Sequence, residues 1–222
     1  MRDCVFLVAD GHMHAVLATF LSLDRFFQKL GTAPFSFHAE RDLVVPEKGR
    51  NDPNVYLQAH VILRGYLATH RHAVVMLDEA WEHRRQPEEI VGHIRRNLVQ
   101  SGWREGQFEI VLIRPELEVW IWQDNPHVQR AFYRRLSAAE RARLPPLRTW
   151  LRDQGLWPEG QPKPSDPKAA VLRARAQFRA GSQTSIYVEI CRSVSLQGCQ
   201  DPAFHQLRDA LRRWFPAPGV TP

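Results

Sequence analysis

A short apolar run that ends abruptly in acidic residues is the feature that most constrains the fold. Residues 73–77 read Ala-Val-Val-Met-Leu, and the acids Asp78, Glu79 and Glu82 follow within five positions. A continuous apolar run of this length predicts a strand buried on both faces, which is typical of parallel sheets. In an open α/β sheet, ligands bind beyond the carboxyl ends of the strands. The acids are therefore expected at the ligand-binding edge.

A second apolar run ends in the same way near the N-terminus. Residues 5–9 are apolar and lead directly into Asp10 and Gly11. If both runs are parallel strands joined by right-handed crossovers, Asp10 and Asp78 lie on the same edge of the sheet. Two buried strands that each end in an acid favour a Mg²⁺ site, because Mg²⁺ prefers carboxylate oxygens and water as ligands.

Strands and helices are predicted to alternate through the first half of the chain. Expected strands cover residues 3–9, 73–78 and 108–113, with another at either 35–38 or 43–45. Apolar residues at helical spacing predict helices over 12–30, 54–69 and 87–100. An exposed basic loop with Lys48, Arg50 and Asn51 precedes the second helix, which Asp52 could cap. This alternation predicts an α/β fold with a mostly parallel, doubly wound sheet.

The second half of the chain has a different pattern. Helices are expected over 126–136, 138–153, 167–180 and 201–214, and a loop rich in proline and glycine over 155–167. Residues 115–123 and 182–191 each fit either a strand or a helix. We therefore predict an α/β core over residues 1–125, with a helical region over 126–222 packed on it.

Composition limits the classes of protein that the chain can belong to. The formal net charge of +6 comes chiefly from arginine and is compatible with a nucleic-acid partner, although many basic proteins bind none. Three cysteines without metal-ligand spacing argue against a disulfide framework or a zinc ribbon, and Cys4 is expected in the core. No apolar stretch approaches the roughly 18 residues of a membrane span, and no signal peptide is evident. A cytoplasmic protein without membrane partners is expected.

The order of these motifs resembles the TOPRIM fold, the metal-binding domain of topoisomerases, primases and OLD-type nucleases. That family carries an acid-glycine pair after its first strand and an Asp-x-Asp motif after a later one. Here Asp10-Gly11 stands where Glu-Gly is usual, and Asp78 stands at the first aspartate of the second motif. The second aspartate is replaced by Ala80, so Glu79 or Glu82 would have to substitute for it.

Later segments resemble a TOPRIM-like bacterial family of unknown function that is related to the RloB proteins. The stretch from Glu116 to Asp124 contains a Glu-x-Trp-x-x-x-Asp pattern that begins at Glu118. Residues 166–168, 182–190 and 201–215 are similar to that family's helical tail. The resemblance implies a component of a bacterial antiphage defence system, such as a methylation-associated system, with partners among the other proteins of a defence operon.

The resemblance and the positions of the acids together imply a Mg²⁺-dependent nuclease or phosphotransfer site. Asp10, Asp78 and Glu118 are its expected catalytic residues. Glu79 and Glu82 join Asp10 and Asp78 as candidate Mg²⁺ ligands, and Lys168 would neutralise charge on the phosphate. The alternative is a non-catalytic subunit that binds nucleic acid or partner proteins. In that case the acids are helix caps and solvated loop residues.

Two His-x-His pairs have the composition of a zinc site but not its expected geometry. His12 and His14 begin a predicted helix, where side chains two positions apart point away from each other. His70 and His72 precede a strand, at the end opposite to Asp78. Surface histidines are the preferred interpretation for all four.

Tryptophans and arginines offer two further candidate contacts with nucleic acid. Trp81, Trp120 and Trp122 could stack on bases, but core packing is preferred. Arginines within 130–148 and 173–179 could follow a phosphate backbone, or could form a solvated helical face. No glycine-rich phosphate-binding loop is present in the sequence, which argues against a nucleotide-sensing regulator.

Overall fold

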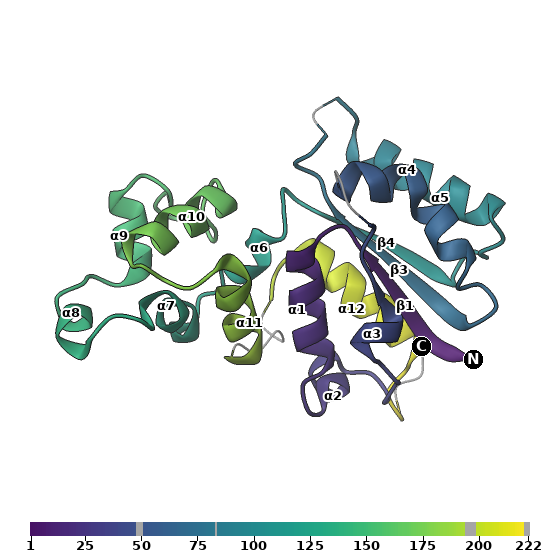
Figure 1. Cartoon of the computed structure of the whole chain (residues 1–222), viewed down its shortest axis with the longest axis horizontal. Coiled ribbons are helices and arrows are strands. Elements are labelled where there is room, and N and C mark those ends of the chain that lie inside the picture. Colours follow the sequence, from purple (N-terminus) through teal and green to yellow (C-terminus); the bar gives the residue numbers. More distant parts are fainter. Residues whose placement is uncertain (48–50, 83, 194–198, 220–222) are drawn as a thin grey trace.

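A parallel sheet lies at the centre of the protein. The structure is a computed structural model, and it describes residues 1–47, 51–82, 84–193 and 199–219. The strands β1 (Arg2–Val8), β2 (Leu43–Val44), β3 (His70–Asp78) and β4 (Phe108–Ile113) are arranged in the order β2-β1-β3-β4 (Figure 1). All neighbouring pairs are parallel. The predicted α/β class is confirmed, and 43–45 is the correct site of the additional strand.

The register places the two expected acids at one edge of the sheet. Val8 pairs with Met76 in the parallel ladder between β1 and β3. Asp10 and Asp78 each lie two positions further along, so Asp10 follows β1 and Asp78 ends β3 at the same edge of the sheet. Asp78 itself pairs with Ile113, the last residue of β4. The predicted common edge is therefore confirmed.

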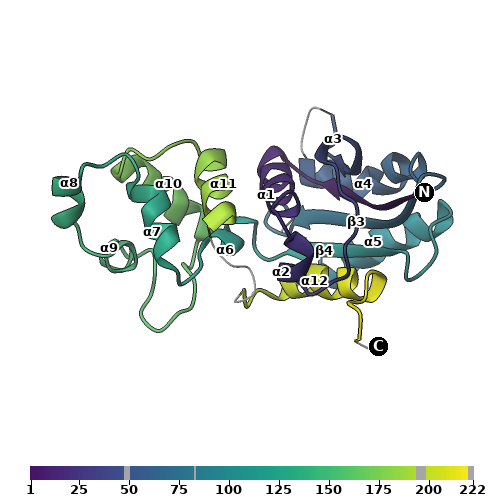
Figure 2. The ribbon, with the colours of Figure 1, turned by 90° about the horizontal axis from the view of Figure 1, so that it is seen from below.

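Helices cover both faces of the sheet (Figures 1 and 2). The helices α4 (Asn51–Arg64) and α5 (Pro87–Gln100) lie on one face, while α1 (Gly11–Leu21) and α12 (Pro202–Trp214) lie on the other. Each presents an apolar stripe at helical spacing. In α5 this stripe is Ile90, Ile94 and Leu98, all of which are fully buried. Burial of these stripes against the apolar strands forms the core.

A second group of helices forms a lobe beside the sheet, on the left in Figure 1. It contains α7 (Pro126–Tyr133), α8 (Ala138–Ala142), α9 (Leu147–Asp153), α10 (Pro167–Gln177) and α11 (Gln183–Ser193). We call residues 126–193 the helical lobe. The helix α11 packs against both α1 and α7, so it connects the lobe to the core. After the lobe, the chain returns to the sheet as α12. The predicted helical region 126–222 thus has two parts.

Several predicted helix boundaries were wrong. The helix expected over 12–30 is interrupted after Leu21, and α2 (Phe26–Leu30) begins after Arg25, whose φ of 54° is left-handed. Proline breaks the helix expected over 138–153, because Pro145 and Pro146 separate α8 from α9. The helix expected over 54–69 is α4, which already includes Asp52 in its first turn. Lys48 and Arg50 of the predicted basic loop lie outside the described residues.

Both ambiguous segments are helical. Residues 115–123 contain α6 (Glu118–Ile121), and residues 182–191 lie largely within α11. A further short helix, α3 (Ala39–Asp42), precedes β2. No helix in the described part of the chain is long and apolar enough to cross a membrane.

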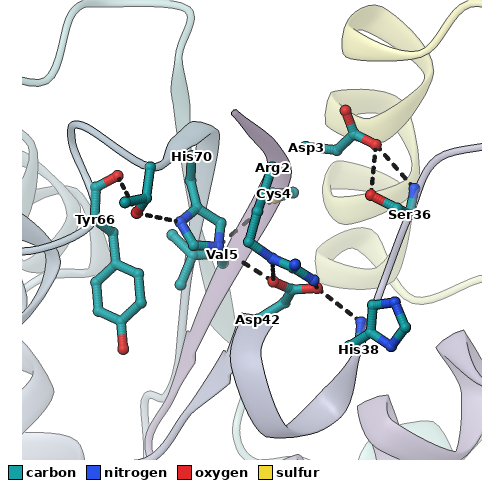
Figure 3. Close-up of polar contacts among 10 residues, drawn as sticks. Arg2, Asp3, Cys4, Val5, Ser36, His38, Asp42, Tyr66 and His70 are labelled. Atoms are coloured by element: carbon teal, nitrogen blue, oxygen red, sulfur yellow. Dashed lines mark hydrogen bonds and ion pairs between the residues drawn. The ribbon is translucent and has the colours of Figure 1, made fainter.

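A buried ion pair at the amino end of the sheet corrects the prediction for His70 (Figure 3). The carboxylate of Asp42 is 1% exposed, and it accepts hydrogen bonds from the Arg2 guanidinium and from the backbone N–H of His38. Nε2 of His70 lies 3.2 Å from the same carboxylate. His70 is therefore a buried partner of Asp42 and not a surface residue. The ring of His72 also contacts another side chain, because it stacks on Trp214.

Candidate functional site

Five carboxyl groups meet at the carboxyl edge of the sheet. Asp10 follows β1, Asp78 ends β3, and Asp52 lies in the first turn of α4. Glu116 and Glu118 follow β4, where the chain enters α6. The other four all act electrostatically on Asp78, which lies at the centre of the group. We call these five residues the carboxylate cluster.

Backbone hydrogen bonds fix the position of Asp78. Its Oδ1 accepts a hydrogen bond of 2.9 Å from the backbone N–H of Leu117. Its own backbone N–H donates to Oδ1 of Asp52 over 2.8 Å. These two contacts connect the end of β3 to the segment after β4 and to the start of α4. The carboxyl group is thus held by the backbone of the fold, with little freedom to turn towards solvent.

Burial and mutual repulsion change the protonation of the cluster. Burial, followed by the charges of Asp52 and Glu118, raises the pKa of Asp78 to about 9. The pKa of Asp52 rises to about 6, chiefly through burial and then through the charge of Asp10. At neutral pH, Asp78 therefore carries a proton when no cation is nearby. A cation bound at the cluster would replace this proton and relieve the repulsion.

Glu118 is the most deeply buried acid of the cluster. It is 2% exposed, and its Oε1 accepts a hydrogen bond of 2.7 Å from the hydroxyl of Tyr187 on α11. Burial and then the charge of Glu118 raise the pKa of Tyr187, so the phenol keeps its proton and acts as a donor. A side chain of the helical lobe thus orients an acid on the core.

Lys168, the predicted phosphate-neutralising residue, lies beside one acid of the cluster. Its Nζ is 3.2 Å from Oε2 of Glu116. Burial alone would lower the pKa of Lys168, but Glu116 and Glu118 raise it on balance, so the ammonium stays charged. Burial, followed by repulsion from Glu118, raises the pKa of Glu116 despite this contact. Lys168 is half exposed and is the cation closest to the carboxylates among the described contacts.

The other predicted acids have different surroundings. Oε2 of Glu79 accepts a hydrogen bond of 2.9 Å from Nε of Arg114. Glu82 forms an ion pair with Arg85 and accepts the backbone N–H of Arg84. Neither Glu79 nor Glu82 is among the four residues whose charges affect the pKa of Asp78 most strongly. Of the predicted site residues, the structure therefore brings together Asp10, Asp78, Glu118 and Lys168. Glu79 and Glu82 contact arginines instead.

Asp10 also acts as a helix cap. Its side chain accepts a hydrogen bond of 2.8 Å from the backbone N–H of Met13, in the first turn of α1. The extended backbone of Asp10 is typical of an N-cap. One carboxylate oxygen is therefore committed to α1, and the other is left to contribute to the cluster. The structural and the chemical interpretations of Asp10 are compatible.

Three residues of this site are not among the site residues predicted from the sequence. Asp52 was interpreted only as a helix cap, Glu116 only as part of a motif, and Tyr187 was not singled out. The Asp52-Pro53 pair does mark the start of α4, and helix starts at the carboxyl edge of a parallel sheet are the usual neighbours of its ligands. That rule points to Asp52. No local signal identifies Tyr187, because it comes from a helix far along the chain.

The donor atoms of the cluster match Mg²⁺ in kind. Mg²⁺ is usually bound by one or two carboxylates, and water or phosphate completes its octahedral shell. Among the described residues, no three His, Cys, Asp or Glu side chains are placed closely enough to hold a metal ion together. A Mg²⁺ ion at the cluster would therefore have to take most of its ligands from water or phosphate. The described residues do not form a site enclosed by three or more protein ligands, such as a structural zinc site.

The tryptophans near the cluster pack in the core, as predicted. Trp120 donates a hydrogen bond of 2.9 Å from Nε1 to Oδ1 of Asp201, the N-cap of α12. Trp122 donates over the same distance to the backbone oxygen of Pro167. Both indoles are at most 5% exposed. They connect α6 to the helical lobe and to α12, and thereby position Glu118.

Comparison with protein-family models, curated proteins and solved structures yields no match to this chain. The TOPRIM-like relationship consequently rests on the motifs Asp10-Gly11, Asp78 and the segment 116–124, and it stays a prediction.

Proposed function

We propose that the carboxylate cluster binds Mg²⁺ and that the protein cleaves or transfers phosphodiester groups of nucleic acid. The observation that supports this proposal is the state of Asp78. A buried acid with four acidic neighbours and a pKa raised to about 9 ionises at neutral pH only when a cation accompanies it. Functional sites commonly combine strong pKa perturbation with like charges in this way.

The residues of the cluster have separate roles in this proposal. Asp10 and Asp78 would hold the ion, which when bound would polarise a phosphate and lower the pKa of a water molecule. Glu118, fixed by the hydroxyl of Tyr187, accepts the proton of the attacking water. Lys168 lies beside Glu116, so its ammonium group is next to the cluster. There it contacts a phosphate oxygen of the substrate and neutralises the charge that develops during the reaction.

We further propose that this activity serves bacterial antiphage defence. The support is the resemblance of residues 116–124, 166–168 and 182–215 to the RloB-related family. Under this proposal, the partners include other proteins of a defence operon. Phage protection by the wild type, and its loss in Asp78→Asn, would be measured by plaque counts on cells that express the complete operon.

Titration calorimetry with Mg²⁺ and Mn²⁺ tests the metal site directly. Wild type should bind one ion, whereas Asp78→Asn should lose measurable binding. Glu105→Gln provides a matched control, because Glu105 is a surface acid that pairs with Arg95 away from the cluster. The control should bind as wild type does. No binding by wild type, with or without nucleic acid, would overturn the proposal.

One observation favours a non-catalytic subunit as the second candidate. The described residues contain no set of three metal-ligating side chains around one point, and a neutral Asp78 is compatible with a purely structural cluster. A subunit of this kind would bind nucleic acid or proteins without cleaving either. Hydrolysis of labelled DNA or RNA by wild type, but not by Asp78→Asn, would exclude it.

A further inference from the structure

Positive charge is concentrated in the helical lobe. Residues 126–193 contain 13 Lys and Arg against five Asp and Glu, whereas the rest of the chain contains 17 against 19. The lobe alone therefore carries a formal charge of +8, and the remainder carries −2. A polyanion is attracted to the lobe far more strongly than to the acidic edge of the sheet.

The lobe also contains a cavity with aromatic side chains in its wall. Its volume is about 540 Å³, within the usual range of small-ligand sites, and it lies between α7, α9 and the loop after α9. Trp122 and Trp157 line it. Trp122 stacks on Phe132 with an interplanar angle of 2°, and the Trp157 ring meets Trp122 edge-on with centroids 5.7 Å apart. These packed rings give the cavity a rigid wall.

Two arginines of α9 line the same cavity. Arg148 and Arg152 are one helical turn apart and therefore lie on the same side of α9. The Arg148 guanidinium lies over the Trp157 ring, 4.9 Å from its centroid, and Nη2 donates to the backbone oxygen of Gln161 over 3.1 Å. These contacts hold a planar cation in a fixed orientation, while its side chain stays 49% exposed. Nη1 of Arg148 also lies 3.7 Å from Oδ2 of Asp124, an exposed acid of the cavity lining that a bound phosphate has to displace. A base can stack on such a plane, and a phosphate can pair with it.

The cavity is connected to the carboxylate cluster through α6. Glu118 begins this helix, and Trp122 follows its last residue. Lys163 fixes the loop after α9 to the same helix, because its Nζ donates to the backbone oxygens of Val119, at 2.9 Å, and of Trp122. A nucleic-acid strand bound in the cavity is therefore separated from the proposed catalytic acid Glu118 by the length of α6.

We propose that this cavity binds one nucleotide of a single-stranded nucleic acid. The base enters the cavity beside the Arg148 plane, and the phosphate pairs with Arg148 and Arg152. Amide side chains of Gln129 and Asn125, which also line the cavity, contact the base edge. A duplex is excluded because its bases are already stacked and paired, whereas an unpaired base is free to enter a pocket. The substrate class rests on the proposed function, but this binding step requires no metal.

Fluorescence anisotropy with labelled oligothymidine and oligouridine, in the presence of EDTA, tests the site. Arg148→Ala and Arg152→Ala should each weaken binding about tenfold. Each should also reduce the slope of log K against log salt by about 0.7. Arg143→Ala, at the end of α8, changes the charge equally but lies outside the cavity lining. It should weaken binding less than about twofold.

Three outcomes would overturn the inference. The first is equal loss of affinity in Arg148→Ala, Arg152→Ala and Arg143→Ala, which would indicate diffuse electrostatic attraction. The second is duplex DNA that binds as tightly as the single strands. The third is competition by a nucleoside monophosphate with the affinity of the oligomer, which would assign the cavity to free nucleotides. Specific binding in EDTA without hydrolysis in Mg²⁺ would overturn only the proposed nuclease.

Discussion

The hydroxyl of Tyr187 lies 2.7 Å from Oε1 of Glu118, and this hydrogen bond joins the helical lobe to the carboxylate cluster. Tyr187 is fully buried on α11, and its ring also packs edge-on against His12 of α1. Any movement of α11 relative to the sheet would break the contact. The lobe thus controls the orientation of an acid that the sheet alone does not fix.

Tyr187→Phe should lower the free energy of unfolding by roughly 1–3 kcal/mol, because it leaves a buried acceptor without its donor. Urea denaturation at pH 7 measures this loss. Tyr133→Phe is the matched control, since that hydroxyl donates over 3.0 Å to the neutral backbone oxygen of Pro145. Tyr133→Phe should lower the free energy of unfolding by less than Tyr187→Phe does. If the proposed function is correct, Tyr187→Phe also reduces kcat, and Glu118→Gln in the same background causes no further loss. Equal costs for both tyrosine variants would contradict the special role of Glu118.

Asp78 should make the protein less stable as the pH rises. Because its pKa is about 9 in the folded state and about 4 in the unfolded chain, the folded state binds more protons between these values. Stability is then lost with increasing pH over that interval, by up to about 1.4 kcal/mol per unit. Asp78→Asn should reduce this dependence, leaving the smaller contributions of Asp52 and Glu116, and be more stable than wild type at pH 8, as measured by urea denaturation. Asp209→Asn, on the exposed side of α12, should retain the wild-type slope, and parallel curves for all three proteins would contradict the assignment.

Asp42 should show the opposite dependence on pH. Burial opposes its ionisation, but hydrogen bonds from Arg2, the backbone of His38 and His70 outweigh burial and lower the pKa of this carboxyl. Its contribution to stability is therefore complete above about pH 4 and is lost as the pH falls through the lowered folded value. Asp42→Asn should cost roughly 2–3 kcal/mol at pH 7 and less at pH 3, as measured by chemical denaturation. A cost that does not change with pH would exclude the ionised pair.

Phe204 should be among the most sensitive positions of the core. It is 2% exposed on α12, and its ring meets Trp120 and Phe20 edge-on at 5.6 and 6.5 Å between centroids. Phe204→Ala removes a ring that connects three elements, so it should lower the free energy of unfolding by about 3–5 kcal/mol. Leu57→Ala, at a side chain that is 53% exposed, should change stability by less than about 0.5 kcal/mol. A small loss for Phe204→Ala would show that α12 is dispensable for folding.

The sheet and the acids at its carboxyl edge could be predicted because they follow from local patterns. The apolar runs before Asp10 and Asp78 are long enough to identify buried strands, and the handedness of crossovers then fixes their relative positions. These features depend on residues close together in sequence, or on general rules of topology.

The remaining features depend on contacts between distant segments. The interruption at Arg25 could not be predicted, because apolar residues continue at helical spacing on both sides of it. The sequence around His70 predicts a surface position, because its partner Asp42 lies 28 positions earlier and the residues adjacent to His70 do not indicate this contact. The partnership of Glu118 with Tyr187 spans 69 positions. Side-chain pairing at such separations is decided by tertiary packing, which sequence periodicity does not encode.

The return of α12 to the sheet has a consequence for how the protein is made. The strands β1, β3 and β4 leave the ribosome long before residues 202–214, whose helix covers β4 and contributes Gln206 and Arg213 to Glu109. The helix α1 already covers part of the same face of the sheet, but the part beside β4 stays uncovered while the entire helical lobe is synthesised. A nascent chain stalled within the lobe would expose that part to chaperones and proteases until α12 covers it.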